Sequence, residues 1–108
     1  MDELELLKER IRKFNKDRDW DQFHSPENLA KSVCIEAGEL LECFQWLSNG
    51  YNIEDIKDEM ADVFVYLLDL ADKLNVNLIE TTNNKMYKNE AKYPVDKCKG
   101  KSDKYDRL

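Results

Sequence analysis

The chain has 108 residues, of which 37% are charged and 42% hydrophobic, and its formal net charge is −6. This length fits one domain, and the acidic balance argues against DNA, RNA or an anionic membrane as partners, since these favour basic surfaces. We find no apolar run near the roughly 18 residues of a membrane span and no basic, apolar leader. The three cysteines lack C-x-x-C spacing, so they suggest neither disulfides nor zinc, and we expect a cytoplasmic protein.

The first half of the chain shows two helical patterns. Apolar side chains recur at helical spacing over residues 3–15 and predict an amphipathic helix. Residues 17–24 lack this period and are interpreted as a loop rich in aromatic side chains. Ser25-Pro26 is a typical helix start, and a second helix is expected from Pro26 to about Leu47. The sequence Ser48-Asn49-Gly50 should end that helix.

The second half predicts two more helices and a tail. A third helix is expected over residues 53–74, with an apolar arc wider than the roughly 100° that a helix with one wet face needs. A fourth is expected over residues 78–91, and the lysine-rich residues 95–108 are expected to form an irregular, mobile tail. The predicted fold is therefore all-α, a four-helix bundle-like chain with one domain over residues 1–94. The wide apolar arc and the short chain predict a homodimer or tetramer.

Two acidic couplets stand out within the second and third predicted helices. Glu36 and Glu39 are three residues apart, as are Glu59 and Asp62, so each pair shares a helix face. Four carboxylates from two helices would form an all-oxygen site suited to Mg²⁺ or Mn²⁺. The alternative is a solvated helix face, because a chain with 23 acidic residues produces such couplets often by chance.

Aromatic residues accompany the acids. Trp46 follows Glu39 by seven residues and Tyr66 follows Asp62 by four, so each aromatic side chain is expected on the face of its couplet. Trp20 and His24 lie in the loop before the second helix. A bound nucleotide would explain this layout, with its metal-bound phosphates at the acids and its base stacked on the aromatic rings. The alternatives are that the tryptophans pack in the core and that His24 only satisfies a loop carbonyl.

Taken in order, these residues resemble the all-α nucleoside triphosphate pyrophosphohydrolases of the MazG-like superfamily, and within it the dCTP pyrophosphatase branch. The resemblance covers nearly the whole chain. It rests on Arg18-Asp-Trp20-x-Gln-Phe-His24-x-Pro26-x-Asn28-Leu29, Glu36-Ala-Gly-Glu39-Leu with Phe44-Gln-Trp46, Glu59-x-Ala-Asp62-Val with Tyr66-Leu-Leu, and Lys85-Met-x-x-Asn89-Glu-x-Lys92-Tyr-Pro94. One departure is Ile35, which stands where the superfamily motif often has a further glutamate.

The resemblance implies roles for these positions, with active sites built where helices of neighbouring chains meet. The implied Mg²⁺ ligands are Glu36, Glu39, Glu59 and Asp62. The implied nucleotide contacts are Trp20, His24, Trp46 and Tyr66, and the implied phosphate contacts are Lys85, Asn89 and Lys92. The absence of an acid at position 35 leaves open which carboxylate orients the water and how many metals bind.

The resulting hypothesis is hydrolysis of a nucleoside triphosphate to a monophosphate and pyrophosphate, with dCTP-like or modified nucleotides favoured as a form of nucleotide-pool house-cleaning. Water held by Glu36 or Glu39 would attack the α-phosphorus. Two other hypotheses stay open from the sequence. The chain could be a non-catalytic helical dimer that binds a nucleotide or partner protein, or a divalent-cation binder without nucleotide chemistry.

Overall fold

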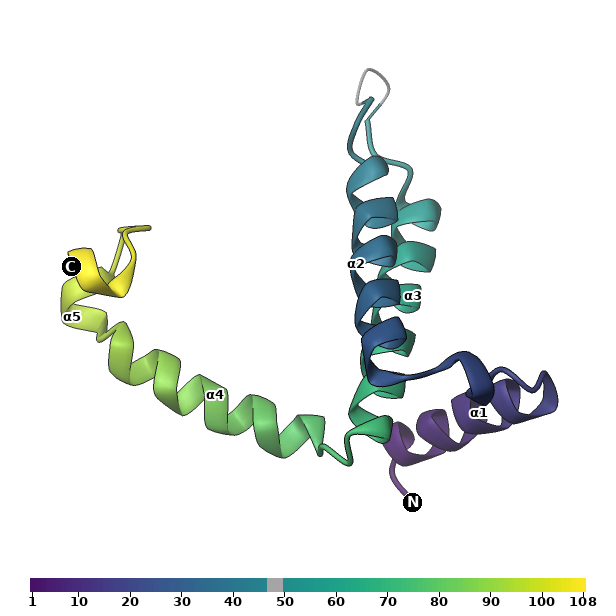
Figure 1. The fold of residues 1–108 in the computed structure, drawn as a ribbon. Coiled ribbons are helices and arrows are strands. Elements are labelled where there is room, and N and C mark those ends of the chain that lie inside the picture. The colour runs from purple at the N-terminus through teal and green to yellow at the C-terminus, as the bar shows by residue number, and fades with distance from the viewer. Residues whose placement is uncertain (47–49) are drawn as a thin grey trace. The chain divides into compact units, whose positions relative to one another are not determined.

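The computed structural model describes residues 1–46 and 50–108, and the described chain forms five α-helices and two short 3₁₀-helices without any strand (Figure 1). The all-α prediction is therefore confirmed. The chain divides into two compact units, residues 1–76 and residues 77–108, which are described separately. These units do not test the predicted domain over residues 1–94, which stays a prediction. No helix of the described residues is long and apolar enough to cross a membrane.

The first unit begins with α1, Glu3–Asp17, which is two residues longer than predicted at its C-terminal end. Asp2 caps this helix by accepting a hydrogen bond from the Glu5 amide at 2.8 Å. Beyond α1, Asp19 takes a positive φ of 54° and turns the chain toward the next segment. The predicted loop contains one short 3₁₀-helix, η1, at Asp21–Phe23.

Helix α2 spans Pro26–Glu42 and begins where the sequence predicted. The Ser25 hydroxyl accepts a hydrogen bond from the Asn28 amide at 3.2 Å, as expected of an N-cap. The helix ends before the predicted Leu47, because the amides of residues 43–45 each bond to the carbonyl three residues back instead of four. The prediction of helix over residues 43–46 is wrong. The predicted end at Leu47 and cap residues Ser48 and Asn49 lie outside the described residues.

Helix α3 spans Ile53–Lys73 and lies beside α2, while α1 packs against α3 (Figure 1). Asn52 caps α3 by accepting a hydrogen bond from the Asp55 amide. The apolar core at the junction of these helices is small. Its buried side chains, among the described residues, are Ile11, Leu29, Ile56, Leu68 and Ala71. So small a core leaves much of the predicted apolar arc uncovered within one chain.

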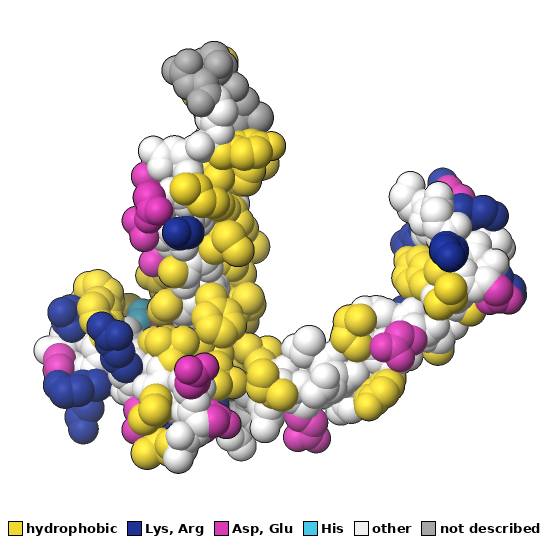
Figure 2. All heavy atoms as spheres, turned by 180° about the vertical axis from the view of Figure 1, so that it is seen from behind, with side chains coloured by type: hydrophobic (Ala, Val, Ile, Leu, Met, Phe, Trp, Pro, Cys, Tyr) yellow, Lys and Arg dark blue, Asp and Glu magenta, His cyan; other side chains and the backbone are white. Residues whose placement is uncertain are grey.

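The uncovered arc forms a stripe along α3. Met60, Phe64, Leu67 and Leu74 recur at intervals of four, three and seven residues, so they share a helix face. Met60 is 57% exposed and Phe64 is 45% exposed, although the sequence pattern places both in a core. Figure 2 shows hydrophobic side chains gathered over one face of the α2–α3 pair. We call Met60, Phe64, Leu67 and Leu74 the apolar stripe.

Two polar links join α1 to α3. The Arg12 guanidinium donates two hydrogen bonds to the Asp72 carboxylate, at 2.7 and 2.6 Å. The second link involves Asn15, three residues after Arg12, and Asp69, three residues before Asp72. The Asn15 side-chain amide donates a hydrogen bond to the Asp69 carboxylate at 3.0 Å. The first link is partly exposed, whereas Asn15 and Asp69 are both buried.

The first link should contribute to stability in a pH-dependent way. The hydrogen bonds from Arg12 lower the pKa of Asp72 below its usual value of 3.8, so the contribution is present above that pH and is lost as the pH falls through the lowered pKa. Because both side chains are partly exposed, we expect less than about 1 kcal/mol. Urea unfolding of wild type and Asp72→Asn should differ more at pH 6 than at pH 2.5. An equal difference at both values would contradict this assignment.

The second unit contains α4, Leu78–Lys92, followed by α5, Val95–Cys98, and the 3₁₀-helix η2, Tyr105–Arg107. The prediction of an irregular tail is wrong for these two short segments. Tyr105 explains part of the order, because its ring meets the Tyr93 ring edge-to-face and lies 4.8 Å from the Lys92 ammonium. These contacts tie the tail to the end of α4. The predicted mobility stays a prediction.

Candidate metal centre and adjoining cavity

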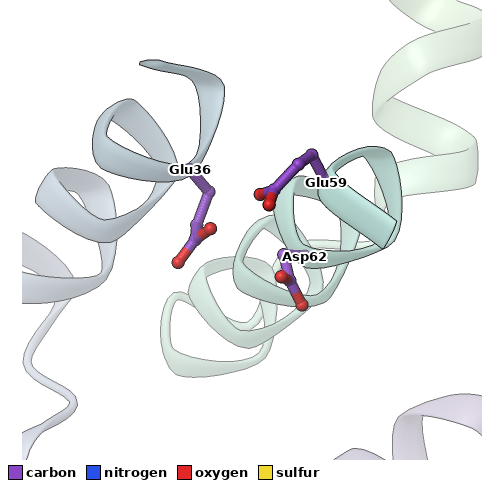
Figure 3. A group of neighbouring side chains, drawn as sticks. All are labelled: Glu36, Glu59 and Asp62. Atoms are coloured by element: carbon purple, nitrogen blue, oxygen red, sulfur yellow. The ribbon is translucent and has the colours of Figure 1, made fainter. Parts of the chain in front are cut away.

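Three of the four predicted acids converge between α2 and α3. Glu36 of α2 and Glu59 and Asp62 of α3 each offer an oxygen, and these three atoms lie within 4.8 Å of one another. Figure 3 shows Glu36 on one helix facing Glu59 and Asp62 on the other. The convergence follows from the spacing, because residues three apart on α3 share the side that packs toward α2. We call these three residues the acidic cluster.

The environment of the cluster fits a divalent cation. Glu36 Oε2 and Glu59 Oε2 are buried yet have no hydrogen-bond partner in the described chain. A side-chain hydrogen bond with Glu39, burial and the neighbouring acids raise the pKa of Glu36 to about 7, and burial with the charges of Glu39 and Asp62 raises the pKa of Glu59. Buried carboxylates that repel one another are costly without a cation, and hard oxygen donors suit Mg²⁺ or Mn²⁺.

Glu39 is the predicted metal ligand that is not among the three converging residues. It is exposed on α2 and lies outside the group of three converging oxygens. Its carboxylate is nevertheless close enough to raise the pKa values of Glu36 and Glu59. Glu39 therefore borders the acidic cluster, and its predicted role as a ligand stays a prediction.

A cavity of about 490 Å³ adjoins the acidic cluster, a volume typical of small-molecule sites. Glu36 and Asp62 line it together with three residues that the sequence singled out, Trp20, His24 and Tyr66. These residues come from α2, α3 and the segment between α1 and α2. Two of the four predicted acids and three of the predicted nucleotide contacts therefore share one cavity, and the roles assigned to them stay predictions.

The wall that carries Trp20 is built by local contacts at the end of α1. The Trp20 amide donates a hydrogen bond to the Asn15 carbonyl at 3.0 Å, and its ring meets the Phe14 ring edge-to-face at 5.5 Å. The Arg18 guanidinium covers the Phe14 ring at 3.7 Å from its centroid. These contacts hold the Trp20 side chain in the cavity wall, where it remains 41% exposed.

Sequence reasoning missed two polar residues of the cavity. Asn15 and Asp69 line it, are only 5% and 8% exposed, and are joined by the hydrogen bond described above. Burial raises the pKa of Asp69, while the bond from Asn15 acts in the opposite direction. The sequence spacing could have indicated both residues. Asp69 continues the polar stripe of Asp62 and Tyr66 on α3, and Asn15 follows Ile11 by four residues on the buried side of α1.

Trp46, the fourth predicted nucleotide contact, does not line this cavity. Trp46 was expected on the α2 face that carries Glu39, but α2 ends at Glu42 and Trp46 is an 82% exposed residue beyond it. That placement is wrong, because the tightened hydrogen bonds after Glu42 end the helix first. Lys85, Asn89 and Lys92 lie on α4 of the second unit. Their phosphate contacts stay a prediction.

Comparison with known proteins agrees with this geometry. The model of the MazG-like family matches residues 31–108. The chain belongs to the MazG-like family. It is 35% identical to the dCTP pyrophosphatase 1 of Rattus norvegicus, over 97% of this chain and 67% of that protein, and 34% identical to the Homo sapiens protein of that name, over the same shares.

A solved structure supports the fold of this MazG-like chain. The crystal structure of a pyrophosphatase from Archaeoglobus fulgidus superposes with a TM-score of 0.80 and 40% sequence identity. The match covers 87% of this chain and 94% of the archaeal one. The resemblance inferred from the sequence motifs is therefore confirmed at the level of the family.

Proposed function

We propose that this MazG-like protein is a Mg²⁺-dependent nucleoside triphosphate pyrophosphohydrolase that favours dCTP-like substrates. Hydrolysis of nucleoside triphosphates is supported by the family and by relatives that are named dCTP pyrophosphatases. The observation that carries the proposal is that Glu36 and Asp62 belong both to the acidic cluster and to the lining of the cavity. Metal-bound phosphates and a nucleoside would thus be held side by side.

Glu36, Glu59 and Asp62 would hold the cation, which when bound would neutralise phosphate charge and lower the pKa of a bound water. Their buried, unpartnered oxygens support this assignment. Mn²⁺ offers similar chemistry to the same donors. The carboxylates also keep this end of the cavity anionic before the cation binds, so they oppose a triphosphate in the metal-free protein.

Glu39 would orient the attacking water. It borders the acidic cluster, is exposed to solvent and is not among the three converging oxygens, so its carboxylate would accept a proton from water. The sequence left this role open between Glu36 and Glu39. We favour Glu39, because Glu36 faces the other acids, whereas Glu39 is exposed to solvent. Attack at the α-phosphorus would release pyrophosphate and leave the monophosphate.

The aromatic residues of the cavity would hold the nucleoside. Trp20 offers a partly exposed ring in the cavity wall, and Tyr66 lines the same cavity one turn beyond Asp62 on α3. Stacking of a base on an aromatic ring contributes roughly 1–3 kcal/mol. His24 lines the same cavity, and Lys85, Asn89 and Lys92 on α4 would contact the phosphates.

We also propose that the protein acts as a homodimer or tetramer in the cytoplasm. The apolar stripe on α3 supports self-association, because side chains with core-like spacing are exposed in one chain. Trp46 would then be available to a site formed with a neighbouring chain. The three cysteines are free thiols, which suits a reducing compartment.

Two measurements separate this proposal from its alternatives. Mg²⁺ should raise the melting temperature of wild type, and dCTP with Mg²⁺ should quench its tryptophan fluorescence and be turned over. A shift with the metal but neither quenching nor turnover would instead indicate a cation binder. Quenching without turnover of dCTP or any other nucleoside triphosphate would indicate a non-catalytic nucleotide-binding protein.

A further inference from the structure

We propose that the buried Asn15–Asp69 pair selects the nucleobase, by accepting a hydrogen bond from an amino group on the edge of the ring and disfavouring a carbonyl there. This inference rests on the proposed function and deepens it. It starts from a feature that catalysis at the acidic cluster leaves unexplained, namely a buried carboxylate and amide in the wall of the same cavity.

The position of the pair suits a base. Asp62, Tyr66 and Asp69 follow one another at intervals of four and three residues, so they lie along one face of α3. At about 1.5 Å per residue, Asp62 and Asp69 are separated by about 10 Å along the helix axis, roughly the length of a nucleoside. All three residues line the same cavity. Phosphates held beside Asp62 would therefore place the base near Asp69.

The polarity of the pair determines what it can recognise. Asn15 Nδ2 donates to Asp69 Oδ1, which turns the amide so that its oxygen and the second carboxylate oxygen remain as acceptors. Among the described residues, neither of these oxygens has another hydrogen-bond partner. An exocyclic amino group, such as that of cytosine, supplies the missing donor. Uracil has a carbonyl at the same ring position. Its oxygen is a hydrogen-bond acceptor and would face the two acceptor oxygens of Asn15 and Asp69 without a hydrogen bond.

A purely structural role is the competing explanation, since the pair also joins α1 to α3. The molecule contains a matched link for comparison. Arg12 and Asp72 join the same two helices through hydrogen bonds to a carboxylate, yet neither of them lines the cavity that adjoins the acidic cluster. If the Asn15–Asp69 pair only held α1 in place, loss of either link should affect all nucleotides alike.

The test compares dCTP with dUTP, which differ on this ring edge. The kcat/KM of wild type should be at least about tenfold higher for dCTP, because a site built for a donor leaves buried acceptors unpaired with the wrong base. Asp69→Asn keeps the shape but can turn an N–H toward a carbonyl. This variant should lower the ratio of kcat/KM for dCTP to kcat/KM for dUTP at least about tenfold. Part of the change should be a rise in kcat/KM for dUTP, which structural damage would not produce.

Asp72→Asn is the control and should leave the ratio unchanged. Asn15→Ala, which frees the Asp69 carboxylate to rotate, should lower the ratio as well and serves if Asp69→Asn fails to fold. Equal wild-type kcat/KM for the two nucleotides, or an unchanged ratio in the folded Asp69→Asn or Asn15→Ala protein, would overturn the inference while leaving the hydrolase intact. Absence of turnover with both nucleotides in wild type would overturn the proposed function itself.

Discussion

Asp62→Asn should lower kcat/KM for dCTP by at least about a hundredfold and remove the Mg²⁺-induced rise in melting temperature. The substitution exchanges a charged donor of the acidic cluster for a neutral amide of the same size. The two remaining oxygens, those of Glu36 and Glu59, would be left without the charge that completes the site. Activity and thermal shift should both be measured over a range of Mg²⁺ concentrations.

Two further variants make the result specific. Asp58→Asn removes the same charge one turn earlier on α3, outside the three converging oxygens, and should keep both activity and metal shift. Glu39→Gln should lose turnover by about 10²- to 10⁴-fold but keep the metal shift, as expected of a residue that orients water. Full activity in Asp62→Asn would remove that residue from the mechanism.

Phe64→Glu should convert the assembled protein into a monomer and lower its melting temperature strongly. Phe64 lies in the middle of the apolar stripe, and a charge there would have to be buried without a partner if another chain covered it. The mass in solution, measured by light scattering, should exceed the 12.8 kDa of one chain at least twofold in wild type and equal it in the variant.

Leu6→Glu provides the matched control for that substitution. Leu6 is another exposed apolar residue, but it lies on α1, outside the apolar stripe. Its replacement should change neither the mass in solution nor the melting temperature appreciably. A monomeric wild type, or a Phe64→Glu protein with the mass and stability of wild type, would contradict the proposed assembly.

Helix positions were largely predictable from the sequence, because they depend on local signals. The caps at Ser25 and Asn52 and the 3.6-residue period of α3 are properties of neighbouring residues. The early end of α2 was not predictable from the sequence, because the apolar pattern continues through Phe44. The backbone amides after Glu42 nevertheless bond to carbonyls three residues back instead of four. Phe44 packs edge-to-face on Tyr51, a contact across the helix connection that no local pattern reveals.

The site residues that share a helix face could be predicted from the sequence. Those that come together only through the packing of different helices were harder to predict. Spacing placed Glu59, Asp62 and Tyr66 together on α3, and the structure brings Glu36 to the first two. Spacing did not distinguish Glu39 from Glu36. It also did not reveal the buried bond between Asn15 and Asp69, since their sequence separation of 54 residues is closed only when α1 packs on α3.

The most direct test of the central claim is the identity of the products. Wild-type protein is incubated with dCTP, with Mg²⁺ or with excess chelator, and the products are separated by ion-exchange chromatography. We predict dCMP and pyrophosphate in equal amounts with Mg²⁺, and no turnover with the chelator. Formation of dCDP and orthophosphate, or the same rate with and without the metal, would contradict hydrolysis at the α-phosphorus by a metal-loaded acidic cluster.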